Sequence, residues 1–188
     1  MPENKYRYGL SRAAIAVITI TDGVYSYGTP IAWPGATALT LSPKGNVEPF
    51  EADNTDYAMI DKSEGYDGEI ETAHIPAAIE AAILAMQEDS KKVAAEYSGK
   101  VYAQFAFLAQ FEGDAYNRRI ALYDCVVTAR PEIAAKTGKT KTPDTTKVKF
   151  AARPRASDNL VKRNTKSDTD ATVYANWFTT VQEPVEGV

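Results

Sequence analysis

The region that most constrains the fold is a long alternating run between Lys100 and Pro131. Apolar residues occupy every second position of its first half: Val101, Ala103, Phe105, Phe107, Ala109 and Phe111. This period of two predicts a β-strand with one face in a core. The turn residues Glu112-Gly113-Asp114 follow, and a second apolar run resumes near Arg118 and ends before Pro131. We therefore predict a hairpin of two long strands in the middle of a sheet.

The second run of this hairpin has an irregular alternation. Ile120 and Leu122 share one parity, whereas Tyr123, Cys125 and Val127 share the other. An extra residue near Asp124 would shift the alternation as a β-bulge. A central strand that is covered on both faces would also show no simple alternation. Both explanations remain open at the level of the sequence.

Shorter strands are predicted over residues 13–21, 24–27, 37–41, 65–75 and 147–153. The turn Asp22-Gly23 joins the first two as a hairpin. The third ends at the turn-forming residues 42–46, and the fourth has Ile70, Thr72 and His74 on one face. Together with the central hairpin, these segments predict an antiparallel, turn-separated architecture.

One α-helix is predicted at about residues 76–87. Pro76 suits a first helical turn, where its missing N–H has no intrahelical partner in any case. Ile79, Ile83 and Met86 fall at helical spacing and form a narrow apolar stripe. Residues 87–99 either extend this helix or form a loop.

These elements predict a mainly β protein, a β-sandwich or barrel-like fold with one flanking helix and extended loops or arms. The 188 residues fit one domain over 1–188. Three segments have no core of their own: an N-terminal arm over 1–12, a basic loop over 134–147, and a C-terminal docking segment over 174–188. The last contains Trp177 and Phe178, which must pack against another surface.

Charge is distributed unevenly along the chain. Residues 130–166 carry 11 basic and 3 acidic residues, a net charge of +8, although the whole chain carries −4. Such a block is either a solvated loop or a basic surface that meets an acidic surface on another copy of the chain. DNA binding is the least favoured interpretation, because the block has no interleaved aromatic residues and the chain is acidic overall.

No motif for catalysis, cofactor binding or metal binding emerges. His74 is the only histidine and Cys125 the only cysteine, so there is no intrachain disulfide, and we expect both residues to be structural. Gly138-Lys139-Thr140 lacks the earlier glycine of a phosphate-binding loop, because position 133 is Ile133. An EF-hand counted from Asp61 fails because Tyr66 stands at the glycine position. We expect a structural or binding protein rather than an enzyme.

Neither a membrane span nor a secretory signal is predicted. No apolar run approaches the ~20 residues that a membrane helix needs, and the first twelve residues lack an apolar segment. We therefore expect synthesis in a reducing cytoplasm. The 11 tyrosines and 2 tryptophans keep a carbohydrate-binding or adhesin-like β-sandwich module open as an alternative function. Trp33 beside Pro34-Gly35 and Trp177 beside Phe178 are, however, placed as core or interface residues usually are.

Short motifs follow one another in a defined order along nearly the whole chain. They are Tyr8-Gly9-Leu10-Ser11, Tyr27-Gly28-Thr29-Pro30, Pro34-Gly35-Ala36, Phe50-Glu51-Ala52-Asp53-Asn54, Gly65-Tyr66-Asp67-Gly68-Glu69-Ile70, Ile75-Pro76, Phe105-Ala106-Phe107-Leu108, Tyr123-Asp124-Cys125, Ala129-Arg130-Pro131 and Asn176-Trp177-Phe178. In this order, the sequence resembles the major tail proteins of long, non-contractile-tailed bacteriophages, in the group common among phages of Gram-positive hosts. Gln87–Gly99 and Lys136–Lys149 match no part of that pattern.

The resemblance implies a virion protein that self-assembles into hexameric rings, stacked as the tail tube through which DNA passes without specific binding. It implies a tape-measure protein and tail-tip or terminator proteins as partners, no membrane, no cofactor and no catalysis. The subunit would be made in the host cytoplasm and would reside in the phage tail. As subunit-interface residues we expect Tyr6, Tyr8, Lys136, Lys139, Lys141, Trp177 and Phe178. Removing residues 174–188 should then leave a folded subunit that cannot polymerise.

Overall fold

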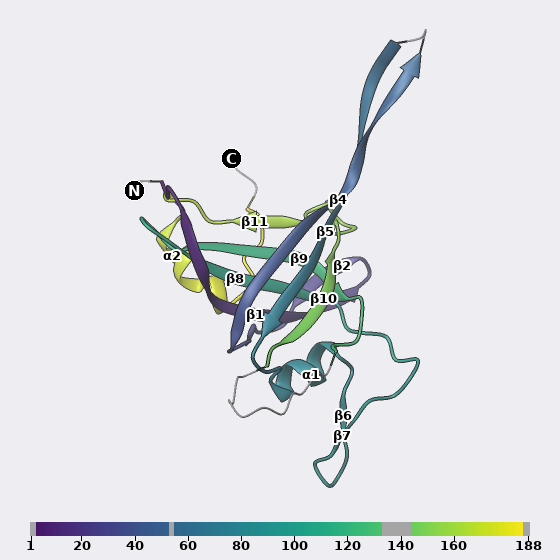
Figure 1. Ribbon diagram of the computed structural model, residues 1–188, viewed down its shortest axis with the longest axis vertical. Coiled ribbons are helices and arrows are strands. Elements are labelled where there is room, and N and C mark those ends of the chain that lie inside the picture. The colour runs from purple at the N-terminus through teal and green to yellow at the C-terminus, as the bar shows by residue number, and fades with distance from the viewer. Residues whose placement is uncertain (1–2, 53–54, 133–143, 186–188) are drawn as a thin grey trace.

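The computed structural model describes residues 3–52, 55–132 and 144–185, with residues 46–52 and 55–62 described by their backbone alone. The fold is mainly β: a nine-stranded antiparallel sheet, a small two-stranded sheet and two short helices (Figure 1). The large sheet contains β1 (Arg7–Thr21), β2 (Val24–Tyr27), β3 (Ile31–Ala32), β4 (Ala36–Ala52), β5 (Thr55–Thr72), β8 (Phe105–Gly113), β9 (Arg118–Val127), β10 (Thr146–Ala152) and β11 (Lys162–Asn164). The small sheet pairs β6 (Gln87–Glu88) with β7 (Ala94–Ala95), and the helices are α1 (Ala77–Ile83) and α2 (Ala171–Ala175), the latter followed by a 3₁₀ turn, η1 (Asn176–Phe178).

The predicted central hairpin is confirmed as β8 and β9. The strand order is β2-β1-β8-β9-β10-β5-β4, so this hairpin lies inside the sheet, while β3 pairs with β1 and β11 with β9. β8 begins at Phe105, four residues after the alternation starts, and Val101 is 90% exposed. The predicted hairpin of residues 13–27 is also confirmed, with Asp22 and Gly23 at positive φ in its turn.

Both explanations for the irregular second run are correct. Phe105 lies opposite Cys125 and Phe107 opposite Leu122, so two steps along β8 correspond to three along β9. The extra residue is a bulge beside Asp124. β9 is also buried without interruption from Ile120 to Cys125, because the sheet is covered on both faces there. The bulge also separates two neighbours of β9: β11 pairs with residues 120–122, before the bulge, and β10 pairs with residues 125–127, after it.

The larger core lies on the face of the sheet that α1 covers. Ile79 and Ile83 of α1 pack there with alternate residues of the central strands, such as Ile15 and Phe107. Leu39, on the edge strand β4, packs against the same cluster, so the sheet curls round this core. Burial of this apolar set supplies most of the stability of the fold.

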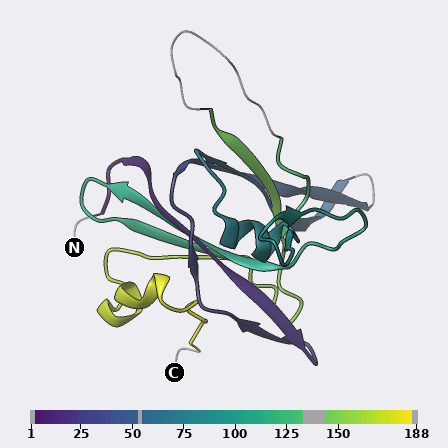
Figure 2. The same ribbon diagram turned by 90° about the horizontal axis from the view of Figure 1, so that it is seen from below.

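A smaller core lies on the opposite face and is closed by the C-terminal segment. It contains Ala14, Leu108, Ala121, Tyr123 and Trp177. In Figure 2, α1 and α2 lie on opposite sides of the central strands. Asp170 caps α2 by accepting hydrogen bonds from the backbone N–H groups of Thr172 and Val173. This second helix was not predicted, because five residues are too few to show a 3.6-residue period.

The predicted helix at 76–87 is shorter in the structure. α1 covers Ala77–Ile83 and ends where Ala85 adopts a positive φ of 55°. Residues 87–99 do not extend it, since they contain the small β6–β7 sheet. Neither helix of the described chain is long and apolar enough to cross a membrane.

The strand predicted over 37–41 continues far beyond its expected end at 42–46. β4 runs to Ala52 and pairs with β5 from Ala36↔Thr72 to Ala52↔Thr55. Pro43 and Gly45 were interpreted as turn residues, but an edge strand tolerates proline, and glycine suits the register shift between Lys44 and Gly45. Gly65, which pairs with Lys44 across this hairpin, has a φ of 100°, and a Cβ there would come within 2.0 Å of the Ala152 carbonyl oxygen.

Part of the predicted N-terminal arm belongs to the sheet. Residues 7–12 lie in β1 and pair with β8, with Arg7 opposite Gly113 and Arg12 opposite Gln110. Asn4 is fixed to the β8–β9 turn, where its side chain accepts hydrogen bonds from the N–H groups of Ala115 and Tyr116. The predicted basic loop lies mostly outside the described residues, and its end forms the start of β10.

Candidate functional site

The outer part of the β4–β5 hairpin is the most distinctive surface feature of the molecule. β10 pairs with β5 only from Thr72 to Tyr66, so beyond Gly65 the hairpin has two strands and no third neighbour among the described strands. This two-stranded part, residues 45–63, is called the ribbon below. Figure 1 shows it projecting from the body at the end opposite α1 and the β6–β7 sheet. Seven residue steps from Gly45 to Ala52 correspond to roughly 23 Å at about 3.3 Å per residue.

The sequence of the ribbon is strongly acidic. Residues 46–61 contain five acidic residues and no lysine or arginine: Glu48, Glu51, Asp53, Asp56 and Asp61. The ladder places Glu51 directly opposite Asp56. Like charges at opposed positions weaken a strand pair. The ribbon is therefore a thin, acidic element for which a basic surface on a partner would be stabilising.

Tyr6 and Tyr8, two predicted interface residues, are at the surface. Their side chains are 57% and 61% exposed. The rings meet edge to face, with centroids 5.5 Å apart and planes at 80°. The pair is available for a contact between subunits, but its rings do not form a flat platform on which a sugar could stack.

Trp177 and Phe178 instead contact the chain's own sheet. Trp177 is 2% exposed, and its indole N–H donates a hydrogen bond of 3.2 Å to the Ile120 carbonyl. The Arg12 guanidinium lies 4.2 Å from the centre of the Phe178 ring. The sequence analysis expected the C-terminal segment to dock on another subunit. In the structure it packs on β1, β8 and β9 of its own chain, on the face that carries the smaller core.

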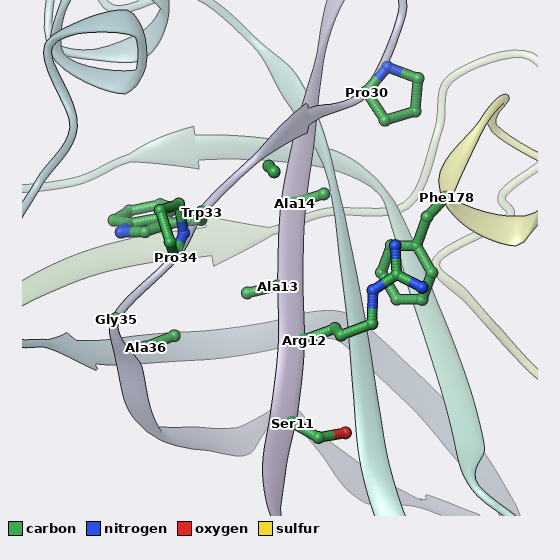
Figure 3. A pocket seen from close by; sticks show the side chains of 11 residues that line it. Ser11, Arg12, Ala13, Ala14, Pro30, Trp33, Pro34, Gly35, Ala36 and Phe178 are labelled. Carbon is green, nitrogen blue, oxygen red and sulfur yellow. The ribbon is translucent and has the colours of Figure 1, made fainter.

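Phe178 also closes one side of a pocket of about 280 Å³ (Figure 3). The pocket lies between β1 and the segment 30–36, with Arg12 stacked on Phe178 on one side of β1 and Trp33 on the other. Trp33 is buried, and its indole N–H has no acceptor among the described residues. The predicted core role of Trp33 is therefore confirmed, and the pocket is formed mainly by packing between β1 and the Pro-Gly segment.

Four basic residues of the 130–166 block form ion pairs within the described chain: Arg130, Lys147, Arg153 and Arg155. Arg130 pairs with Glu96 at 2.5 Å and Lys147 with Glu69 at 2.8 Å. The Lys147 ammonium lowers the pKa of Glu69, chiefly through their hydrogen bond. Arg153 binds the buried Asp124 beside the bulge at 3.1 Å. Lys136, Lys139 and Lys141 lie outside the described residues, so their predicted interface role stays a prediction.

The buried Arg155 is the centre of a polar cluster that holds the C-terminal segment. Its guanidinium donates to Asp158 at 2.6 and 2.9 Å, to Glu183 at 2.8 Å, and to the Tyr27 hydroxyl at 3.1 Å. Tyr27 in turn donates to the Tyr123 carbonyl at 3.2 Å. Burial raises the pKa of Tyr27, so its hydroxyl stays protonated and keeps donating. The cluster connects β2, the loop before β11 and the C-terminal segment. No pattern in the sequence predicted it.

Acid should loosen this cluster. The Arg155 hydrogen bonds lower the pKa of Asp158 to about 2, from an ordinary value of 3.8. A depressed pKa means that the carboxylate stabilises the fold above about pH 4 and that this contribution disappears as the pH falls towards 2. Because the Asp158 side chain is 40% exposed, we expect at most about 1 kcal/mol. The difference in unfolding free energy between wild type and Asp158→Asn should be constant above pH 5 and vanish near pH 2; a difference that persists at pH 2 would contradict the assignment.

The residues best suited to nucleophilic or metal chemistry are not arranged for it. Cys125 is fully buried in β9, and burial raises the pKa of its thiol well above the ordinary value. His74 is exposed beyond the end of β5. Among residues 3–52, 55–132 and 144–185, no group of His, Cys, Asp and Glu is placed to hold a metal ion.

The sequence matches no protein-family model and no curated protein.

Proposed function

We propose that this protein is the major tail tube subunit of a long, non-contractile bacteriophage tail. It self-assembles into stacked hexameric rings, and DNA passes through the resulting tube without specific binding. The observation that carries this proposal is the two-stranded ribbon of residues 45–63. Two of the motifs that resemble tail tube proteins fall in the β4–β5 hairpin, since residues 50–52 of one lie in β4 and residues 65–70 of the other lie in β5.

The ribbon needs a partner for physical reasons. An isolated two-stranded hairpin is marginally stable in water, because it buries little apolar surface and leaves both outer edges unpaired. Such a long projection is expected where a neighbouring subunit covers it. The ribbon projects from one end of the body, whereas α1 and the β6–β7 sheet lie at the other (Figure 1). A contact between different surfaces of identical subunits is heterologous and generates rings or extended polymers.

The curled sheet supports a barrel-like subunit. Leu41 on β4 and Leu10 on β1 pack against one apolar cluster, although β4 and β1 lie far apart in the strand order. β4 and β1 thus lie on two sides of one core, an arrangement that is typical of a sandwich or a partly open barrel. This architecture leaves the edge strand β4 and the ribbon for contacts between subunits.

The remaining assignments follow from the resemblance. A tube subunit of this kind works with a tape-measure protein and with tail-tip or terminator proteins, resides in the virion and has no catalytic role. The net charge of −4 agrees with a tube that lets DNA slide rather than holding its phosphates. The subunit is synthesised in the host cytoplasm and is then assembled into the tube.

Electron microscopy of the purified protein tests the proposal directly. Negative-stain images and size-exclusion chromatography across a concentration series should show rings or tubes of uniform width. If the protein remains monomeric, purified tail-tip complex is added as an initiator. A monomer under both conditions would refute the tube, and saturable binding on a glycan array would then establish the carbohydrate-binding alternative.

A further inference from the structure

A second pocket, of about 270 Å³, opens between the base of the ribbon and the end of the central hairpin. Its apolar wall includes Leu39 and Leu41 of β4 and Phe111 of β8. Three basic side chains complete it: Arg7 from β1, Arg118 from β9 and Lys162 from β11. No acidic residue lines the pocket. It therefore combines an apolar wall with a strongly positive rim.

The three cations are not neutralised within the described chain. Arg7, Arg118 and Lys162 form no ion pair among the described residues, unlike Arg130, Arg153 and Arg155, which each have a carboxylate partner. Arg7 lies over the Phe111 ring at 4.7 Å. Lys162 lies over the Tyr66 ring at 4.3 Å and donates to its hydroxyl at 2.7 Å. Aromatic faces orient two of the cations without satisfying their charge.

We infer that this pocket receives the acidic ribbon of a second copy of the chain. Three converging positive charges favour an anionic ligand, and the apolar wall favours carboxylates carried on a segment with apolar neighbours. The ribbon has both properties, because residues 46–61 include five acidic residues as well as Phe50 and Met59. Placing Glu51 and Asp56 beside the basic rim would also relieve the repulsion between these opposed positions.

The ribbon of the same chain cannot reach this pocket. Leu41 and Tyr66 in the pocket wall stand at the base of the same hairpin. From Leu41 to Ala52 the strand runs eleven residues away, roughly 36 Å at about 3.3 Å per residue. Figure 1 shows the ribbon leading away from the body. A contact between ribbon and pocket therefore joins two copies. This inference rests on the proposed self-assembly and assigns its interface.

Zero-length cross-linking tests the contact with the full chain. Equal amounts of unlabelled and ¹⁵N-labelled protein are mixed, assembled and treated with a carbodiimide, which joins a lysine amine to a carboxylate in contact. Mass spectrometry should find Lys162 linked to an acidic residue of 48–61 in mixed light–heavy pairs. Lys162→Arg keeps the charge and removes the amine, so it should lose the cross-link and retain assembly.

Charge reversal provides the second measurement. Arg118→Glu should raise the critical concentration for assembly on the order of tenfold, because like charges then face each other. Combining it with the single reversal Glu51→Lys should restore assembly, because one pair of opposite charges is then exchanged for another while Asp56 stays available to Arg7 and Lys162. Lys91→Glu, at an exposed position in the β6–β7 turn, should have no effect. Circular dichroism checks that each variant is folded.

The outcomes separate this inference from the proposed function. Tubes without the Lys162 cross-link, with Arg118→Glu assembling like Lys91→Glu, would refute the pocket contact and leave the tube intact. The cross-link in a protein that forms only irregular oligomers would support the pocket contact and refute the tube. Cross-links from Lys162 to carboxylates outside 48–61 alone would also overturn the inference.

Discussion

Trp177→Ala is expected to lower the unfolding free energy of the monomeric subunit by about 3–5 kcal/mol, the range for removing a buried large aromatic side chain. Trp177 fills the smaller core between Leu108, Ala121 and Tyr123. Alanine would leave a cavity there and would also leave the Ile120 carbonyl without its indole donor. The C-terminal segment would lose its main anchor on the sheet, and unfolding would begin at this face.

Chemical denaturation of the protein below its assembly concentration measures this effect. Trp177→Phe keeps most of the ring volume and should cost less than the alanine variant. Thr179→Ala, at an exposed position two residues away, should change stability by no more than about 0.5 kcal/mol. If Trp177→Ala were as stable as wild type but failed to assemble, the segment would dock on a neighbouring subunit after all, as the sequence alone had suggested.

Removing the ribbon is expected to abolish assembly while the subunit stays folded. Gly45 and Ser63 are partners across the hairpin, so residues 46–62 can be replaced by Asn-Gly, which forms the tight turn that a two-residue connection requires. The body should retain its stability, because the pairing of β5 with β10 ends at Tyr66 and is untouched. The variant should remain monomeric at concentrations at which wild type forms rings or tubes.

Size-exclusion chromatography, electron microscopy and thermal unfolding of the same samples distinguish the possible results. Asp53→Asn combined with Asn54→Gly introduces the same turn sequence at unchanged ribbon length and serves as the matched control. Normal tubes from the shortened variant would show that the ribbon is not an interface. A large drop in melting temperature would show that the ribbon contributes to the fold of the subunit itself.

The two experiments distinguish segments that stabilise the fold of the subunit from segments that make contacts between subunits. Trp177 and the Arg155 cluster hold the C-terminal segment within the chain. Beyond Gly65 the ribbon pairs with no further strand in the part of the chain that the structure describes. We therefore expect the first variant to act on folding and the second on assembly.

The strands with one buried face were predictable from the sequence. Alternation identified β8 and β10, since side chains of a strand point to opposite faces in turn. Apolar runs identified β9 and, with the turn Asp22-Gly23, the β1–β2 hairpin. The irregular parity beside Asp124 even signalled the bulge and the central position of β9. α1 was found from Pro76 and the spacing of Ile79 and Ile83, although its end at Ile83 was not.

Long-range partners decided the rest. Pro43 and Gly45 carry a local turn signal, and only pairing with β5 turns that segment into a continuous edge strand. The apolar C-terminus had to pack somewhere, but whether on its own sheet or on another subunit depends on the shape of the face left open by β1, β8 and β9.

Local periodicity thus accounts for the mainly β character and the central hairpin, because a two-residue repeat is a property of neighbouring residues. The tertiary structure decided which strands meet, that Trp177 is internal, that Arg155 joins three segments, and that Arg7, Arg118 and Lys162 converge. These residues are separated by tens of positions, and their proximity arises from the curl of the sheet rather than from any repeat along the chain.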